Sequence, residues 1–249
     1  MARYKLLIEY DGRPFCGWQR QPNAPSVQQA LEVAVLRFCG EVTTVEGAGR
    51  TDAGVHATGM VAHVDIAKPT EPRVVRNAIN AHIAPNPVSV LAAEEVAANF
   101  HARFSAIERQ YIYTIVNRVS PLTHDRGLAW HVPQALNIAA MQSAAEAFIG
   151  QHDFTSFRST SCQAKSPVKT LDGLSVVVDG HRLRIHAQAL SFLHNQVRII
   201  TGALVKVGRG KWTCDDILAA LDAKDRNRGP ETAPPFGLTL SRVIYPSDT

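Results

Sequence analysis

The first ten residues alternate between apolar and polar side chains. This period of two predicts a half-buried strand over Arg3 to Tyr10, with one face formed by Tyr4, Leu6, Ile8 and Tyr10. A helical period follows, because apolar residues recur 3, 4, 7, 8 and 11 positions after Val27. Ser26 is placed to cap this helix, Gln29 to complete a capping box, and Gly40 to end it.

The rest of the first hundred residues completes a β-α-β-β-α-β order. The pattern predicts strands over Val42 to Val45, Met60 to Ile66 and Val88 to Ala92, and a helix over Arg73 to Ile83.

The second half repeats this order and adds one helix. Alternation around Tyr113 predicts a strand, and Asp179-Gly180 predicts the turn of a hairpin. The remaining expected elements are a helix over Ile138 to Ile149 closed by Gly150, hairpin strands over Leu174 to Val178 and Leu183 to Ala189, helices over Gln196 to Val207 and from Thr213 with Asp216, and a strand over Leu238 to Tyr245.

These elements predict an α+β fold of two split β-α-β (ferredoxin-like) lobes, with mostly antiparallel sheets flanked by helices. A length of 249 residues suits two small domains. We place the lobes at residues 1–105 and 106–249, with the boundary near residues 100–108.

Composition narrows the classes of protein. With 45% hydrophobic and 19% charged residues, the chain is neither disordered nor collagen-like. No apolar run approaches the roughly 20 residues of a membrane span, and the first residues lack a signal-peptide core, so we expect a cytoplasmic protein. The four cysteines lie far apart, which predicts free thiols. A net charge of +4 permits a nucleic-acid partner without requiring one.

The loop from Gly47 to Ala57 has the most unusual composition. Its glycines permit tight turns, but a dinucleotide-binding motif would need glycine in place of Asp52, and no Gly-Lys-Ser/Thr of a phosphate loop follows. Asp52 is the one acid of the loop. It is either a nucleophile or general base, or a turn-forming residue that bonds its own backbone.

A metal site is not expected. Asp52, His56, His63 and Asp65 are close in sequence but lack the spacing of known zinc motifs.

Other segments combine aromatic residues with cations. Phe100 to Tyr113 includes Arg103 and Arg109 beside Tyr111, which suits base stacking and phosphate contact, although Tyr111 or Tyr113 must belong to the core. Arg198 lies in the first turn of its helix, where the dipole disfavours a cation and an ion pair with a carboxylate would offset this. Two loops, Ser156 to Lys169 and Ala223 to Pro235, carry cations at Arg158, Lys165, Lys169, Lys224, Arg226 and Arg228.

At these residues the sequence resembles the TruA-type tRNA pseudouridine synthase family, nearly from end to end. The matching blocks are Tyr10-Asp11-Gly12, Gly17-Trp18-Gln19, Gly47 to Ala57, Phe100 to Tyr113, Ser156-Phe157-Arg158, Phe192 to Arg198 and Gly237-Leu238. The sequence departs from the family pattern where Met60 replaces Gln, Asn195-Gln196 replaces His-Met, and Ile199 replaces Asn.

The resemblance implies an isomerase that converts uridine to pseudouridine at positions 38, 39 and 40 of the tRNA anticodon stem-loop, without cofactor or metal. It implies a homodimer whose lobes enclose a basic active-site cleft. It also implies base flipping, with Asp52 as a nucleophile that attacks either the ribose or the uracil ring. It further implies an Arg198–Asp52 ion pair, stacking of Tyr111 and Leu238 on the uracil, and insertion of Arg50 into the gap. Arg103, Arg109, Arg158, Lys165, Arg226 and Arg228 would contact RNA.

The sequence is also compatible with two other functions. A catalytically inactive RNA-binding chaperone of tRNA would keep the basic loops but would not need Asp52 together with Arg198. A metal hydrolase would lose its activity in EDTA.

Overall fold

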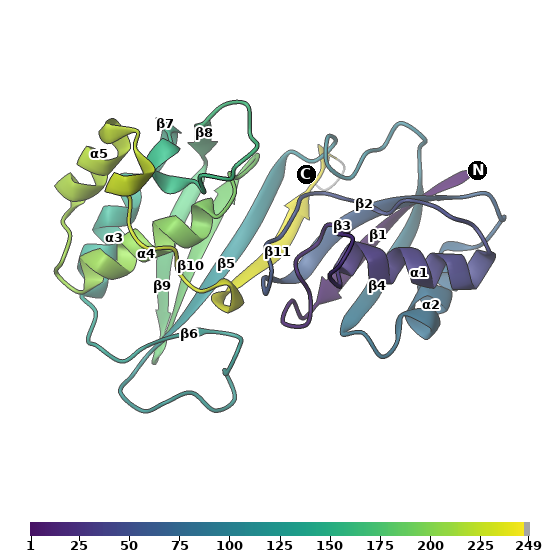
Figure 1. Cartoon of the computed structure of the whole chain (residues 1–249), viewed down its shortest axis with the longest axis horizontal. Helices are drawn as coiled ribbons and strands as arrows, with labels where there is room; N and C mark the ends of the chain where they lie inside the picture. The colour runs from purple at the N-terminus through teal and green to yellow at the C-terminus, as the bar shows by residue number, and fades with distance from the viewer. Residues whose placement is uncertain (247–249) are drawn as a thin grey trace. The chain divides into compact units, whose positions relative to one another are not determined.

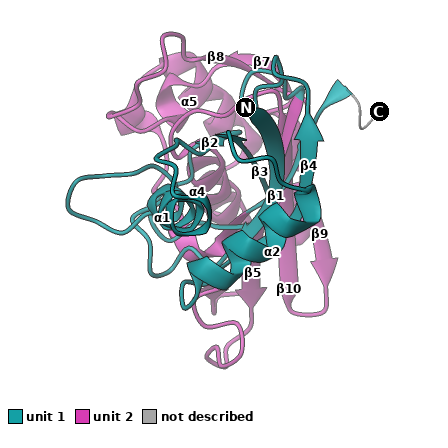
Figure 2. Ribbon diagram, turned by 90° about the vertical axis from the view of Figure 1, so that its right-hand side faces the viewer, with its two compact units in different colours: residues 1–107, 240–249 teal, residues 108–239 magenta. Residues whose placement is uncertain are grey.

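The computed structural model describes residues 1–246 and divides the chain into two compact units (Figure 2). The first unit contains residues 1–107 together with residues 240–249, and the second contains residues 108–239. The chain therefore leaves the first unit once and returns to it with its last segment.

The first unit is a sheet with two helices on one face (Figure 1). Strand β1 pairs antiparallel with both β3 and β4, and the sheet order is β4-β1-β3-β11. The alternating face of β1 is buried, as its sequence predicts, and α1 packs against α2. The elements are β1 (Ala2–Tyr10), α1 (Val27–Cys39), β2 (Glu46–Gly47), β3 (His56–Ile66), α2 (Pro72–Ile83), β4 (Val88–Val96) and the end of β11 (Leu238–Ile244).

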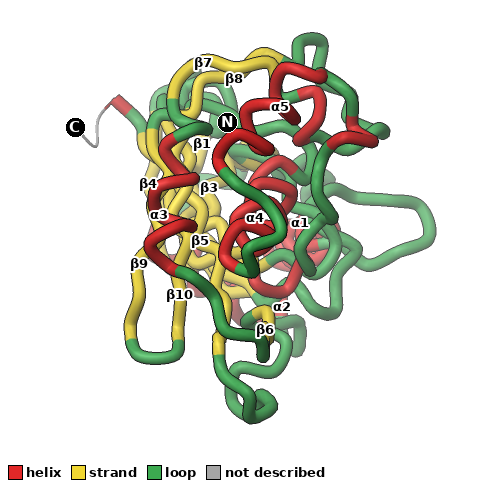
Figure 3. Tube along the Cα trace, turned by 90° about the vertical axis from the view of Figure 1, so that its left-hand side faces the viewer, coloured by secondary structure: helices red, strands yellow, loops and turns green. Residues whose placement is uncertain are grey.

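The second unit is built on an antiparallel order of β5-β10-β9, with β6 parallel to β5 and a separate β7-β8 pair. Helix α3 contacts both α4 and β9 (Figure 3). The elements are β5 (Glu108–Asn117), β6 (Trp130–Val132), α3 (Ile138–Glu146), β7 (Gly150–Asp153), η1 (Thr155–Phe157), β8 (Val168–Leu171), β9 (Gly173–Asp179), β10 (Arg182–Ala189), α4 (Gln196–Gly208), α5 (Cys214–Ala223), η2 (Arg226–Arg228), η3 (Pro235–Gly237) and the start of β11.

These mixed helices and mostly antiparallel strands confirm the α+β class. The cap and the C-terminal end predicted for α1 are also confirmed: the Ser26 hydroxyl accepts the Gln29 backbone N–H, and Gly40 ends α1 with φ 78°. This is one of the two bonds of the capping box expected there; the return bond from the Gln29 side chain stays a prediction. Thr213 and Asp216 form a reciprocal capping box at α5. Within residues 1–246, no helix has the length and apolarity needed to cross a membrane.

The prediction of a strand over Val42 to Val45 is wrong. Val42 is 93% exposed, and only the two residues of β2 pair with β3. Side chains bond this segment instead: the Glu32 carboxylate accepts the Val45 N–H, and the Thr43 hydroxyl donates to the carbonyl of Asp65. With these contacts made, the segment follows an irregular path.

The helix expected over Ile138 to Ile149 ends early, at Glu146. Phe148 and Ile149 bond carbonyls three residues back, so the last turn tightens and Gly150, at φ 96°, begins β7. Strands β6, β7 and β8 are three or four residues long, too short to show a hydrophobic period.

Replacement of Gly59 by alanine tests the close approach of β3 to β11. A Cβ at Gly59 would lie 2.2 Å from the carbonyl oxygen of Ser241, which is backbone and cannot rotate away. We expect Gly59→Ala to lower the free energy of unfolding by about 1–3 kcal/mol, as other overpacked sites do. The matched control is Gly49→Ala, where a Cβ meets nothing within 4 Å. Equal thermal midpoints for the two variants would contradict the expectation.

Candidate functional site

The Asp52 loop runs from β2 to β3 and is held by the loop that follows β1. Gly17 has φ 94°, and a Cβ there would lie 2.4 Å from the carbonyl oxygen of Thr51. The backbone N–H of Trp18 donates to that same oxygen at 3.1 Å. Only glycine can occupy position 17 while the two backbones lie this close.

A second glycine fixes the other side of the Asp52 turn. A Cβ at Gly12 would lie 2.0 Å from the carbonyl oxygen of Val55, and the Gly12 N–H donates to Nδ1 of His56 at 3.1 Å. The Val55 N–H donates to the backbone carbonyl of Asp52, at 3.1 Å, and closes the turn. The backbone carrying Asp52 is thus positioned from both ends, and its side chain is half-exposed.

Hydroxyl and acidic groups complete this part of the site. The Tyr10 and Thr51 hydroxyls lie 2.9 Å apart. Burial alone would raise the pKa of Asp11, but hydrogen bonds from Arg13 outweigh it and lower the pKa below its ordinary value. Asp11 is therefore an ionised partner of Arg13, while Arg50 is exposed two residues before Asp52.

In the second unit, β5 presents Tyr111 and Tyr113 on the same face. Tyr113 is fully buried, and its hydroxyl donates to the carbonyl of Pro234 at 2.8 Å. Burial raises the pKa of Tyr113 far above its usual range, so it stays a protonated donor. Tyr111 is half-exposed, and its ring meets Phe192 edge to face at 5.1 Å. The expectation that one of the two tyrosines belongs to the core is confirmed for Tyr113.

The segment before β11 lies directly on β5. A Cβ at Gly237 would lie 2.7 Å from the Tyr113 ring, so glycine is required at this contact. Leu238 follows at once and is 6% exposed. The Tyr113 ring therefore fixes the place where Leu238 enters β11.

Arg198 is the third residue of α4, and its guanidinium is held in a fixed direction. Nε donates to the carbonyl of Ala233 at 2.9 Å, and Nη1 donates to Oδ1 of Asn195 at 2.7 Å. The Ala233 N–H returns a bond to the carbonyl of Arg198 at 3.2 Å. These bonds orient the cation and connect α4 to the loop before β11.

The residues that depart from the family pattern have structural roles. Asn195 precedes α4 with φ 64° and accepts from Arg198. Gln196 is buried and accepts the Leu193 N–H at 2.8 Å, which caps the turn. Met60 and Ile199 are fully buried in the cores of their own units.

The two basic loops of the second unit lie against each other. The Ser156 hydroxyl accepts the Asp225 N–H at 2.9 Å, and a Cβ at Gly229 would lie 2.1 Å from the Ser156 carbonyl oxygen. The first loop is also bonded to the segment before α4, through the Ser159 N–H and the carbonyl of His194 at 2.9 Å. The structure thereby brings the segment that carries Arg158 next to the segment that carries Arg226 and Arg228.

These cations differ in exposure. Lys165 and Arg228 are exposed, while Arg158 and Arg226 are half-buried. Burial lowers the pKa of Arg226.

Arg103 and Arg109 occupy contrasting environments. Arg103 is exposed beside the ring of Phe104. Arg109 is 8% exposed, and its guanidinium donates to the carbonyl of Leu190 at 2.7 Å. Arg109 thus holds β5 to the residue that follows β10, and its RNA contact stays a prediction.

In the described residues, Glu46, His63 and His101 bring ligand atoms within 4.8 Å of one another. Burial, with a contribution from Arg3, lowers the pKa of His63, which favours its neutral form. Nδ1 of His63 accepts the Ala102 N–H at 3.3 Å, and Nδ1 of His101 accepts the Arg103 N–H at 3.1 Å. A neutral imidazole that accepts at Nδ1 carries its proton at Nε2, so each ring offers an N–H there. The cluster thus suits a carboxylate acceptor better than a metal ion.

Sequence reasoning singled out His63 but missed Glu46 and His101. Only the fold brings these residues together, because His101 lies 38 positions after His63.

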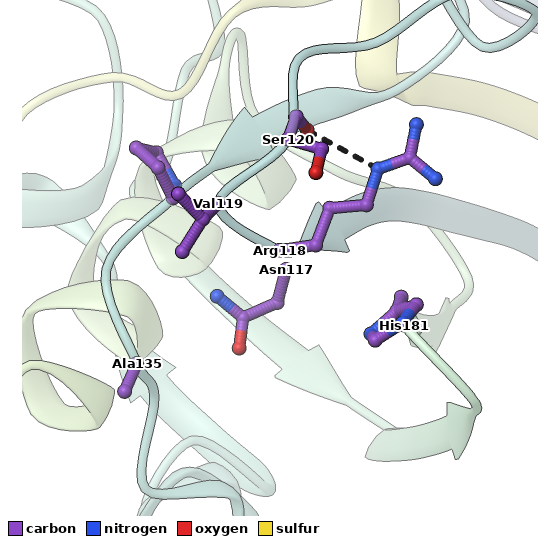
Figure 4. A pocket seen from close by; sticks show the side chains of 7 residues that line it. Asn117, Arg118, Val119, Ser120, Ala135 and His181 are labelled. Carbon is purple, nitrogen blue, oxygen red and sulfur yellow. Dashed lines mark hydrogen bonds between the residues drawn. The ribbon is translucent and has the colours of Figure 1, made fainter.

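A surface hollow lies at the end of β5, and none of the residues that line it was predicted for the site (Figure 4). The Arg118 guanidinium donates to the carbonyl of Ser120 at 3.2 Å, and the Asn117 amide donates to the carbonyl of Val132 at 2.7 Å. The polar groups of these two side chains are thus used to shape the surrounding loop.

Comparisons with known proteins agree with the motifs of both units. The family model described as tRNA pseudouridine synthase matches residues 6–105 and 144–246. The chain is 58% identical over 245 residues to tRNA pseudouridine synthase A of Rhodopseudomonas palustris strain HaA2, covering 98% of this chain and 100% of the relative. It is 52% identical over 249 residues to the protein of the same name in Rhodospirillum rubrum, covering 100% of this chain and 90% of the relative. Because the family pattern spans both units and the relatives align along nearly the whole length, this chain belongs to the tRNA pseudouridine synthase family.

Proposed function

We propose that this protein isomerises uridine to pseudouridine at positions 38, 39 and 40 of the tRNA anticodon stem-loop, with Asp52 as the nucleophile. The coarser activity, an isomerase that makes pseudouridine in tRNA, follows from the family. The observation that carries the finer proposal is the Asp52 turn, which Gly12 and Gly17 hold by backbone contact. A nucleophile gains from such positioning because its geometry is set before the substrate arrives.

The chemistry fits the side chains. The N1–C1′ bond of uridine breaks, a C5–C1′ bond forms, the C5 proton leaves, and N1 gains a proton. Oxidation state does not change, so a carboxylate nucleophile and groups that hold the detached uracil are sufficient. The base must leave the helix stack to reach Asp52, and Arg50 is proposed to fill the gap.

Residues of the second unit would hold the flipped base. Tyr111 is half-exposed and would stack on the uracil, with Leu238 on the opposite side. Arg198, oriented by Asn195 and Ala233, would pair with Asp52 and keep it ionised. A homodimer acting in the cytoplasm, with the basic loops on the tRNA backbone, completes the proposal.

Asp52→Asn removes the charge of the nucleophile and keeps its shape. We expect the rate of pseudouridine formation on unmodified tRNA transcripts to fall by about a thousandfold or more, with tRNA affinity nearly unchanged. Asp222→Asn, on the exposed side of α5, is the matched control and should keep the wild-type rate. Mapping pseudouridine in the product tests the positions. A normal rate for Asp52→Asn would exclude the nucleophile, and binding without turnover in the wild type would favour the RNA chaperone.

Arg198→Lys keeps the positive charge but removes the planar guanidinium group, which Asn195 and Ala233 orient by hydrogen bonds. Lysine cannot reproduce two fixed donors together with an ion pair, so we expect kcat to fall by about tenfold to a hundredfold. Arg209→Ala, at the other end of α4, should leave kcat unchanged. Wild-type kcat for Arg198→Lys at all pH values would contradict the pairing with Asp52.

We expect four phosphate contacts, which come from Arg158, Lys165, Arg226 and Arg228. The logarithm of the association constant for tRNA should then fall with the logarithm of the salt concentration, with a slope of about −3. Lys165→Ala should reduce the steepness of this slope by about one. The exposed Lys211 lies outside both loops, so Lys211→Ala serves as the control. The prediction fails if affinity does not change with salt, or if both variants keep the wild-type slope.

A further inference from the structure

Phe104 is the only exposed aromatic side chain in the described part of the chain. It is 75% exposed, whereas every other phenylalanine, tyrosine and tryptophan within residues 1–246 is buried or half-buried. Burying a phenylalanine side chain stabilises a folded protein by about 2 kcal/mol, and Phe104 does not make this contribution. A single exposed apolar residue is common, so the fixed setting of this ring is the informative feature.

The turn carrying Phe104 is fixed by His101. Nδ1 of His101 accepts the backbone N–H of Arg103 at 3.1 Å and that of Phe104 at 3.4 Å. The backbone N–H of His101 donates to the Ser105 hydroxyl at 2.9 Å. The backbone N–H of Ser105 donates back to the carbonyl of His101, also at 2.9 Å. The imidazole also lies against the Phe104 ring, with centroids 4.4 Å apart.

His101 is in turn anchored to the rest of the first unit. Its Nε2 lies 3.1 Å from the Glu46 carboxylate, and its ring lies 4.7 Å from that of His63. The carbonyl of the next residue, Ala102, accepts the hydroxyl of the buried Tyr245 at 2.7 Å. The turn thus has little freedom, and an aromatic ring on it loses little entropy when a ligand binds.

We propose that Phe104 and Arg103 form a contact for an unpaired nucleobase of the tRNA, in which Phe104 stacks on the base and Arg103 meets its phosphate. The guanidinium of Arg103 already lies 5.4 Å from the centre of the Phe104 ring, the pairing of cation and aromatic face that suits single-stranded nucleic acid. This contact rests on the proposed function, because it assigns part of the same tRNA to the first unit.

The position of Glu46 connects this contact to the catalytic loop. Glu46 belongs to β2, which leads directly into the loop carrying Asp52. The bond between Glu46 and His101 therefore joins the base contact to the start of that loop. A nucleotide stacked on Phe104 would be held in the same rigid frame as the nucleophile.

The test measures binding separately from turnover, with unmodified tRNA, oligouridine and heparin as probes. Stacking of one base on one ring predicts that Phe104→Ala weakens the affinity for tRNA and oligouridine by about 5- to 150-fold. Its affinity for heparin, which has charge but no bases, should not change. Phe104→Trp keeps an aromatic ring and should bind tRNA and oligouridine as tightly as the wild type does. The fluorescence of the added indole, measured as the difference from the wild type, should be quenched when tRNA binds.

Val42→Ala is the matched control, because Val42 is also exposed on the first unit and should bind all three probes normally. Thermal unfolding should be unchanged in Phe104→Ala, which excludes loss of the fold. Wild-type affinity for tRNA in Phe104→Ala would overturn the proposal, as would equal weakening for heparin, or a change of oligomeric state without a change in RNA binding. Absence of pseudouridine formation by the wild type would overturn the proposed function and leave this binding test in force.

Discussion

The approach of one backbone to another at Gly12 and Gly17 is the constraint on which the loop carrying Asp52 depends. A Cβ at Gly12 would lie 2.0 Å from the carbonyl oxygen of Val55, and one at Gly17 would lie 2.4 Å from that of Thr51, so no other residue fits without moving the loop. Contacts between backbones have no rotamers and therefore position atoms more narrowly than side-chain packing does. The half-exposed carboxylate of Asp52 is thus carried by a rigid turn.

The second unit positions its proposed groups by different means. Side chains that bond backbone carbonyls fix the direction of Arg198 and the path before Leu238, through Ala233 and Pro234. These bonds connect β5, α4 and the loop before β11, which are far apart in sequence. A substitution in any one of the three would therefore move the other two, and variants there should show coupled effects on activity.

Local periodicity was sufficient for much of the fold, because elements such as β1 and α1 each bury one continuous face. It failed at Val42 to Val45, where Glu32 and the carbonyl of Asp65 take the bonds that a sheet would otherwise make. At the site, the glycines beside Asp52 were visible in the sequence, but their partners were not. Neither the burial of Arg109 nor the meeting of Glu46 with His101 leaves a local signal, since both arise from tertiary contacts.

The return of residues 240–249 to the first unit has a consequence for biosynthesis. Ile107 donates its N–H to the carbonyl of Ile244, and the Tyr245 hydroxyl donates to the carbonyl of Ala102, so the first unit lacks part of its own structure until residues 240–246 are made. At about 5–20 residues per second, the ribosome needs roughly 7 to 26 seconds to add the residues 108–239 that come before them. During that time β3 lacks its partner β11, while the residues of the second unit are already being made. The first unit, although its residues are made first, would therefore be completed after the second.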